Sequence, residues 1–255
     1  MCLLAFAYNS HADTPLVVCS NRDEFYQRPT LPMHWWPETS ILAGRDEQAG
    51  GTWLGLSRSG RFAAVTNFRD LRHPTFDGEK PLSRGHLVSD FLGADNNARE
   101  WSQSINHEMD NYGGFNLLIF DGRELLYINN YTKQTTPLTA GVYALSNHLL
   151  DSPWPKVDYA RTQLRSALKT AESESWDMQN LASLLSRQTP YPDDQLPSTG
   201  VPPEWERLLS SPMISAEGYG TRASTAVVIS ASGKIAVAEK SHQPGGDSHC
   251  EVFTF

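Results

Sequence analysis

The chain has 255 residues, of which 39% are hydrophobic and 20% are charged, and its formal net charge is −8. A chain of this length can bury a sizeable core. The acidic balance and the lack of any run rich in lysine or arginine argue against a nucleic-acid partner. No apolar stretch reaches the length of a membrane span.

The first residues have neither the basic segment nor the cleavage site of a secretory signal peptide. The three cysteines, Cys2, Cys19 and Cys250, are widely spaced and predict neither a disulfide framework nor a metal site. We therefore expect a cytoplasmic protein with no metal and no resident cofactor. Axial ligation of free haem by a single histidine or cysteine remains compatible with the sequence.

In chain order, two hairpins are predicted first. Residues 3–8 form a continuous apolar run that predicts a strand buried on both faces. A polar turn separates it from a second strand at 16–20, and this hairpin returns residues 21–24 to the start of the chain. Prolines and tryptophans between 29 and 37 indicate an irregular segment, after which residues 50–56 and 61–67 form a second hairpin that ends on Asn67.

Helices and further strands alternate in the rest of the chain, without the regular βαβ rhythm of a doubly wound fold. Helices are expected at 83–92, 98–105, 157–171, 178–186 and 204–209, and strands at 115–121, 124–130, 141–147, 224–230, 234–240 and 251–255. No repeat or linker divides the sequence, so a single domain over residues 1–255 is predicted.

Cys2 is the most informative candidate residue. Initiator methionine is normally removed when the next side chain is small, and its removal would leave Cys2 with a thiol and a free α-amine. An α-amine has an ordinary pKa of about 7.7–8.0 and can accept a proton near neutral pH. The pattern predicts a nucleophile that carries its own base, at the tip of a buried strand.

Four further polar residues stand at the ends of predicted strands: Arg22, Asn67, Asn147 and Arg222. Arg22 would lower the pKa of the Cys2 thiol, because a nearby cation favours the thiolate. Asn67 and Asn147 would donate to an oxyanion, and Arg222 would hold the nucleophile or a substrate carboxylate. Each of these residues alone also suits a purely structural role at a strand end.

Five segments carry a family resemblance. Asn21-Arg22-Asp23-Glu24, together with MCLLAF at the start, GGTWLG at 50–55, VTNFRD at 65–70 and SRGHLVSDFL at 83–92, resembles the NRDE family. That family is named for the tetrapeptide and includes the transport-and-Golgi-organisation proteins of eukaryotes. The resemblance implies an α+β fold, a four-layer αββα sandwich of the N-terminal-nucleophile hydrolase type, and links the eukaryotic relatives to haem trafficking and to lipid or acyl-CoA homeostasis.

The chain also resembles bile-salt hydrolases and penicillin V acylases, more distantly. The match implies Cys2 as nucleophile and amine base, Arg22 as thiolate stabiliser, and Asn67 and Asn147 as oxyanion donors, with Arg222 as the late arginine. Those hydrolases have an aspartate three residues after the first arginine, which orients the α-amine, whereas this chain has Phe25 there. Asp23 or Glu24 would have to substitute, and strand register decides which of them does so.

Two functions fit these residues. The first is an N-terminal-cysteine amidohydrolase acting on a non-peptide carbon–nitrogen bond of a small acylated substrate, with Asp23 among the catalytic residues and Glu24, Trp53 and Phe68 in substrate binding. The alternative is a non-catalytic protein that binds or carries haem or an acyl conjugate in the same cleft. Aromatic residues such as Trp35, Trp36, Trp53 and Phe68 suit either a pocket or an ordinary core. A structural partner protein with a vestigial site is a third possibility.

Overall fold

The computed structural model describes residues 2–72, 80–171 and 176–255. Their contacts group into two units, which are described separately. The first unit consists of the segments up to Gln27, Thr139–Ser146 and Leu150–Phe255, and the second consists of Arg28–Leu138 and Asn147–Leu149.

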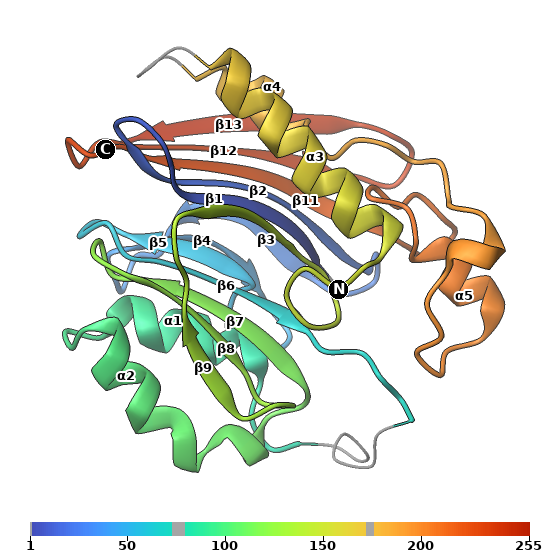
Figure 1. The fold of residues 1–255 in the computed structure, drawn as a ribbon, viewed down its shortest axis with the longest axis horizontal. Helices are drawn as coiled ribbons and strands as arrows, with labels where there is room; N and C mark the ends of the chain where they lie inside the picture. The colour runs from blue at the N-terminus through green and yellow to red at the C-terminus, as the bar shows by residue number, and fades with distance from the viewer. Residues whose placement is uncertain (1, 73–79, 172–175) are drawn as a thin grey trace. The chain divides into compact units, whose positions relative to one another are not determined.

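The first unit is built on an antiparallel sheet, whose described strands lie in the order β10-β1-β2-β11-β12-β13 (Figure 1). These strands are β1 (Cys2–His11), β2 (Thr14–Phe25), β10 (Gly141–Leu145), β11 (Tyr219–Ile229), β12 (Ile235–His242) and β13 (Ser248–Thr254). Its helices are α3 (Pro155–Thr170), α4 (Met178–Ala182), the short η4 (Asp193–Gln195) and α5 (Pro203–Leu208).

The second unit has its own antiparallel sheet, in which the described strands run in sequence order from β3 to β9. The strands are β3 (Thr30–Trp35), β4 (Ile41–Asp46), β5 (Leu54–Ser57), β6 (Phe62–Asn67), β7 (Phe115–Phe120), β8 (Leu125–Asn129) and β9 (Gln134–Pro137). Its helices are α1 (Arg84–Gly93), α2 (Ala98–Ser104), η2 (Ile105–His107) and η3 (Met109–Asn111).

Helices cover one face of each sheet. In the first unit, Leu3 and Ala5 of β1 pack in one apolar cluster with Val157 of α3 and Leu181 of α4. In the second unit, the corresponding cluster joins strands β4, β6, β7 and β8 to the apolar residues of α1 and α2. The predicted α+β class is confirmed, and two helix-covered antiparallel sheets are the parts that an αββα fold requires.

Strand β1 is buried on both faces, as its continuous apolar sequence predicts. Leu3 and Ala5 face the helices, and the alternate residues Leu4 and Phe6, which point to the other face of the sheet, are also buried. The β1–β2 hairpin is confirmed too, but β2 extends to Phe25. Residues 21–24 therefore lie within a strand, instead of in the loop after it.

The segment from 29 to 37 differs from the sequence-based expectation. It contains strand β3, which pairs with β4. Strand β3 stands at the edge of its sheet, and its pairing with β4 shifts register between Leu31 and His34, around Pro32. A proline cannot donate to a sheet ladder, but an edge strand with an irregular register tolerates one. The prolines therefore mark an edge strand here, not an irregular loop.

Two glycines from different sequence motifs meet in the second unit. A Cβ atom at Gly51 would lie 2.5 Å from the carbonyl carbon of Gly85 and 2.8 Å from its oxygen, and the Thr52 amide donates to that oxygen at 3.2 Å. Gly51 belongs to the GGTWLG segment and Gly85 to the SRGHLVSDFL segment. The two glycines permit the loop before β5 to contact the first turn of α1 backbone to backbone.

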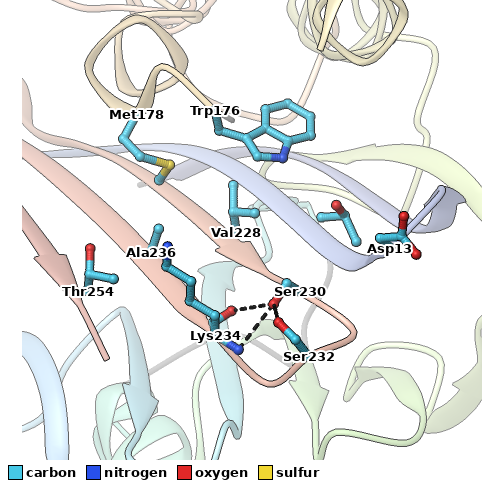
Figure 2. Close-up of a pocket in the computed structure, with 10 residues that line it drawn as sticks. Asp13, Trp176, Met178, Val228, Ser230, Ser232, Lys234, Ala236 and Thr254 are labelled. Atoms are coloured by element: carbon cyan, nitrogen blue, oxygen red, sulfur yellow. Dashed lines mark hydrogen bonds between the residues drawn. The ribbon is translucent and has the colours of Figure 1, made fainter. Parts of the chain in front are cut away.

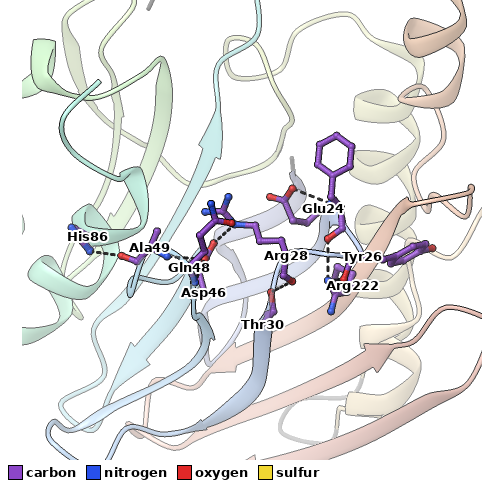
Figure 3. A network of polar contacts seen from close by, with 10 residues as sticks. Glu24, Tyr26, Arg28, Thr30, Asp46, Gln48, Ala49, His86 and Arg222 are labelled. Carbon is purple, nitrogen blue, oxygen red and sulfur yellow. Dashed lines mark hydrogen bonds and ion pairs between the residues drawn. The ribbon is translucent and has the colours of Figure 1, made fainter. Parts of the chain in front are cut away.

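A polar network fixes the same loop (Figure 3). Asp46 at the end of β4 forms an ion pair with Arg28 at 2.7 Å and accepts from the backbone amides of Gln48 and Ala49, each at 3.1 Å. The Ala49 carbonyl is in turn 2.8 Å from Nε2 of His86 in α1. The polar contacts of Asp46 and His86, together with the contact between Gly51 and Gly85, thus fix the start of the GGTWLG segment.

Candidate functional site

Cys2 lies directly opposite Arg22 in the antiparallel pairing of β1 with β2. Cross-strand partners point their side chains to the same face of a sheet, so the thiol and the guanidinium share a face, the one turned away from α3 and α4. Both residues are buried. The Cys2 carbonyl accepts from the hydroxyl of Ser146 at 3.3 Å, which ties the start of β1 to the segment that follows β10.

The thiol pKa does not follow the expectation from sequence. Burial raises the pKa of the Cys2 thiol and outweighs Arg22, which acts to lower it as predicted, while Asp23 acts to raise it. Burial also raises the pKa of the Cys19 thiol, which lies within strand β2. The sequence-based picture of a thiolate stabilised by Arg22 alone is therefore incomplete.

Alternation along β2 divides the tetrapeptide between the two faces of the sheet. Leu3 pairs with Asn21 and faces the helices, so Asn21 and Asp23 point to the helix side and Arg22 and Glu24 to the Cys2 side. On the helix side, the Asn21 amide donates to the carbonyls of Leu185 and Pro212, at 3.0 and 2.9 Å. Its oxygen accepts from Ser224 at 2.7 Å.

Register also decides which carboxylate is placed to meet the amine. Because β1 and β2 are antiparallel with Cys2 opposite Arg22, the backbone nitrogen of Cys2 lies on the side of the pair toward position 23. Asp23 is buried and accepts from the Thr221 hydroxyl at 2.6 Å. Glu24 lies one residue further along the strand, and its carboxylate accepts from the Phe25 amide at 2.9 Å.

The pKa of the Asp23 carboxyl is raised above its ordinary value. Burial raises its pKa, and Lys156, the hydrogen bond from Thr221, and Arg22 act in the opposite direction. Lys156 is itself buried in the first turn of α3, where its ammonium donates to the Leu209 carbonyl at 2.7 Å. Nothing in the sequence marks Lys156 as buried, since a lysine in a helix normally lies on the solvated surface.

Arg222 lies inside β11, and not before it as the sequence predicted. The pairing of β11 with β2 shifts register between Thr221 and Ala223, so Arg222 occupies a β-bulge. One guanidinium nitrogen donates to the carbonyls of Phe25 and Tyr26 at 3.2 and 3.4 Å (Figure 3). The contacts secure the end of β2.

Asn67 and Asn147 are brought together within the second unit. The Asn147 side-chain amide donates to the Asn67 carbonyl at 3.0 Å, and the Asn147 carbonyl accepts from the Arg69 amide at 2.7 Å. Asn67 ends strand β6, as predicted, whereas Asn147 follows the end of β10 by two residues. Asn147 is fully buried and Asn67 is partly exposed.

The aromatic residues proposed for binding have defined neighbours in the second unit. Phe68 is buried and stacks on Tyr131 and on His148, with ring centroids 4.4 and 5.0 Å away. Trp53 lies over Gly44, where a Cβ atom would meet its ring at 2.2 Å. Trp36 belongs to the apolar cluster beneath α1, whereas Trp35 lies under the guanidinium of Arg58 at 3.9 Å.

The stack on Phe68 predicts a pH-dependent stability. Burial lowers the pKa of the His148 imidazole, so the folded chain favours the neutral ring. This contribution is present above the ordinary pKa of about 6.5 and is lost as pH falls through the lower folded-state value. The free energy of unfolding of the wild type, measured by urea denaturation from pH 8 to pH 5, is expected to fall more than that of His148→Gln. Parallel curves for the two proteins would contradict the expectation.

The family model described as Transport and Golgi organisation 2 matches residues 1–244. The chain belongs to this family. The human homologue of Transport and Golgi organization protein 2 is 31% identical over 276 residues, covering 100% of this chain and 98% of the human protein. The Drosophila melanogaster protein of that name is 25% identical, covering 98% and 95% of the two chains.

Two solved structures are similar to this chain in shape over most of its length, at low sequence identity. The Caenorhabditis elegans orthologue of N-acylethanolamine-hydrolyzing acid amidase has a TM-score of 0.48 at 11% identity, covering 89% of this chain and 92% of its own. The C2A mutant of conjugated bile acid hydrolase from Clostridium perfringens has a TM-score of 0.43 at 8% identity, covering 98% and 96%. Likeness at this level assigns no residue role to a member of the Transport and Golgi organisation 2 family.

A hollow of about 270 Å³, drawn in Figure 2, lies in the first unit beside the turn between β1 and β2. Cys2 is at the other end of β1. It is bounded by the β1–β2 turn at Asp13, by the β11–β12 turn from Ser230 to Lys234, and by Trp176 and Met178. No predicted site residue of this family member lines it. Within the described parts of the chain, no group of three or more histidine, cysteine, aspartate or glutamate side chains is arranged to hold a metal ion, and no helix is long and apolar enough to cross a membrane.

Proposed function

We propose that this chain is an N-terminal-cysteine amidohydrolase that cleaves a non-peptide carbon–nitrogen bond of a small acylated substrate. The observation that supports this most directly is the pairing of Cys2 with Arg22 beside Asp23. It puts the thiol and the guanidinium on one face of the sheet at the start of a buried strand, and Asp23 follows Arg22 on the side toward the Cys2 nitrogen. The thiol and the cation agree with the roles that the sequence resemblance implies for Cys2 and Arg22, and Asp23 is proposed in place of the aspartate that this chain lacks at position 25.

In the proposed reaction, removal of Met1 exposes the Cys2 amine. The thiol transfers its proton to this amine, and the sulfur attacks the substrate carbonyl carbon. The carbon–nitrogen bond then breaks, the leaving amine takes the proton, and a thioester remains on Cys2. Water, deprotonated by the same amine, attacks the thioester, releases the carboxylic acid and restores the thiol.

The other residues have proposed roles in that scheme. Asp23 holds the amine. In this role it replaces the aspartate that the hydrolases named above have at the position where this chain has Phe25. Arg22 favours the thiolate against the burial that opposes it. Arg222, tied to the end of β2, stabilises the site from the bulge.

Asn67 and Asn147 are proposed as oxyanion donors on the sequence resemblance. Glu24, Trp53 and Phe68 are proposed to contact the substrate. The position of Glu24 on the same face of the sheet as Cys2 supports a role for it in substrate binding.

Intact mass and substrate release together test the proposal. The purified protein should lack one methionine, and it should release amine from at least one member of a panel of N-acyl amino acids, penicillin V, bile-salt conjugates and acyl thioesters. Retained Met1 would contradict the proposal, because the Cys2 nitrogen would then be an amide.

The same panel separates the enzyme from a carrier of haem or an acyl conjugate. A haem titration followed by absorbance is run on the same preparation. Tight haem binding with no turnover, and with no effect of substitutions at Cys2, Asn67 and Asn147, would favour the carrier.

A further inference from the structure

The bulge in β11 decides which side chain stands opposite Asp23. In the pairing of β11 with β2, Ala223 lies opposite Arg22 and Thr221 lies opposite Asp23, so Arg222 is the extra residue of the bulge. Without an extra residue, the register would continue unbroken and put Arg222 opposite Asp23. A guanidinium in that place would form an ion pair with the carboxylate. The bulge puts a neutral hydroxyl there instead.

A neighbouring segment fixes the direction in which this hydroxyl donates. The Ile214 amide donates to Oγ1 of Thr221 at 2.9 Å, and the Thr221 amide donates to the Ile214 carbonyl at 2.8 Å. A hydroxyl has one proton to donate. Because Oγ1 already accepts from the Ile214 amide, that proton is directed to Oδ1 of Asp23, which lies 2.6 Å from Oγ1.

The contact between Thr221 and Asp23 is buried, since the two residues are 2% and 1% exposed. An O–H group that donates to a carboxylate lies about 2.5–2.7 Å from the acceptor oxygen, and the distance of 2.6 Å fits such a charge-assisted bond. Burial raises the pKa of Asp23, whereas this hydrogen bond acts to lower it. Thr221 thus favours the carboxylate form and fixes the position of one of its oxygens.

We propose that Thr221 is a positioning residue that holds the Asp23 carboxylate beside the Cys2 amine. The inference rests on the proposed function, which gives Asp23 the task of holding that amine. Strand β2 lies between β1, which carries Cys2, and β11, which carries Thr221. Thr221 therefore acts on the amine only through Asp23.

Titration of the Cys2 amine tests this role without any substrate. The chain from Cys2 to Phe255 is released from a fusion that is cleaved directly before Cys2, and its cysteines are labelled with nitrogen-15. The Cys2 nitrogen is then an amine, whereas the nitrogens of the other cysteines are amides, and its NMR signal is followed from pH 5 to pH 10.

Thr221→Val keeps the shape of the side chain and removes its hydroxyl. A nearby carboxylate favours the protonated amine, so this variant is expected to lower the pKa of the Cys2 amine by about half a pH unit, or about threefold in proton affinity. Thr221→Ser keeps the hydroxyl and should preserve the wild-type pKa. No fall in Thr221→Val would overturn the inference.

Thr225→Val is the matched control. Thr225 is also 2% exposed on β11, but it lies opposite Ser20, and so on the other face of the sheet from Asp23. Its hydroxyl is 3.4 Å from Oε2 of Glu239. The pKa of the amine should stay unchanged in this variant. An equal fall in Thr225→Val and Thr221→Val would contradict the inference, because any buried hydroxyl of β11 would then have the same effect.

A double variant distinguishes action through Asp23 from a general effect on the sheet. Asp23→Asn combined with Thr221→Val should give the same amine pKa as Asp23→Asn alone. A further fall in the double variant would also count against the inference. If Thr221→Val does not fold, because the Ile214 amide loses its acceptor, Thr221→Cys takes its place. A thiol is a weak acceptor and a weak donor, so the amine pKa should fall in that variant too, and an unchanged value would be decisive against Thr221.

The two proposals fail separately. A lower amine pKa in Thr221→Val with no turnover of any substrate would leave the role of Thr221 standing and contradict the hydrolase. Turnover with an unchanged amine pKa would contradict the role of Thr221 and leave the hydrolase standing.

Discussion

Replacement of Cys2 by alanine is expected to abolish amine release from every substrate that the wild-type protein hydrolyses. The change removes the sulfur that forms the thioester, and loss of a nucleophile costs on the order of a thousandfold or more in turnover. Since Cys2 packs at the start of β1 opposite Arg22, removal of one sulfur atom should leave ligand affinity nearly unchanged. The measurement is the burst of amine release after mixing, followed together with equilibrium binding of the same substrate.

Two variants control this experiment. Cys2→Ser retains the amine and a hydroxyl, and is expected to bind normally but react more slowly, because a hydroxyl is a weaker nucleophile than a thiol. Cys250→Ala removes a half-buried cysteine of β13 and should leave the burst intact. Amine release that persists in Cys2→Ala would exclude Cys2 as the nucleophile.

Substitution of Gly51 by alanine is expected to lower the free energy of unfolding. The new methyl group would lie 2.5 Å from the carbonyl carbon of Gly85 and 2.8 Å from its oxygen. Both are backbone atoms, which cannot rotate away as the end of a side chain can. Overpacking of this kind costs about 1–3 kcal/mol, occasionally more. A shift in the midpoint of thermal unfolding and a smaller free energy of unfolding in urea would report it.

Gly93→Ala is the matched control for that change. Gly93 is the last residue of α1, and a Cβ atom there would meet nothing within 4 Å. Alanine favours a helix over glycine by roughly 0.5–1 kcal/mol, so this variant should be as stable as the wild type or slightly more stable. Equal losses in Gly51→Ala and Gly93→Ala would show that the close approach of Gly51 to Gly85 is not what requires glycine.

Much of the fold could be read from local sequence. The apolar run at 3–8 predicted a strand buried on both faces, and the turn after it predicted the hairpin that places Arg22 near the start of the chain. The helical spacing of Leu87, Val88, Phe91 and Leu92 predicted α1, because these four side chains form its buried face. Such signals are local: each depends on the period of apolar residues and on the residues that end an element.

Other features depend on neighbours distant in sequence. Strand β3 carries Pro32 and was missed, since only its edge position makes a proline acceptable. The helix side of β2 is a similar case. Residues 21–24 are four consecutive polar residues, and only the pairing register shows that Asn21 and Asp23 face the helices while Arg22 and Glu24 face the other way.

The sequence by itself determined the chemical groups at the start of this chain: a potential N-terminal thiol, an arginine placed by a hairpin, and two candidate carboxylates. The tertiary structure decided which carboxylate lies on the amine side of Cys2, because pairing register is set by the sheet and not by composition. It also brought Lys156, which is 133 positions away from Asp23 in the chain, into the electrostatic surroundings of that carboxylate. Burial then set the acidity of both Cys2 and Asp23, since the cost of a buried charge depends on everything packed around it.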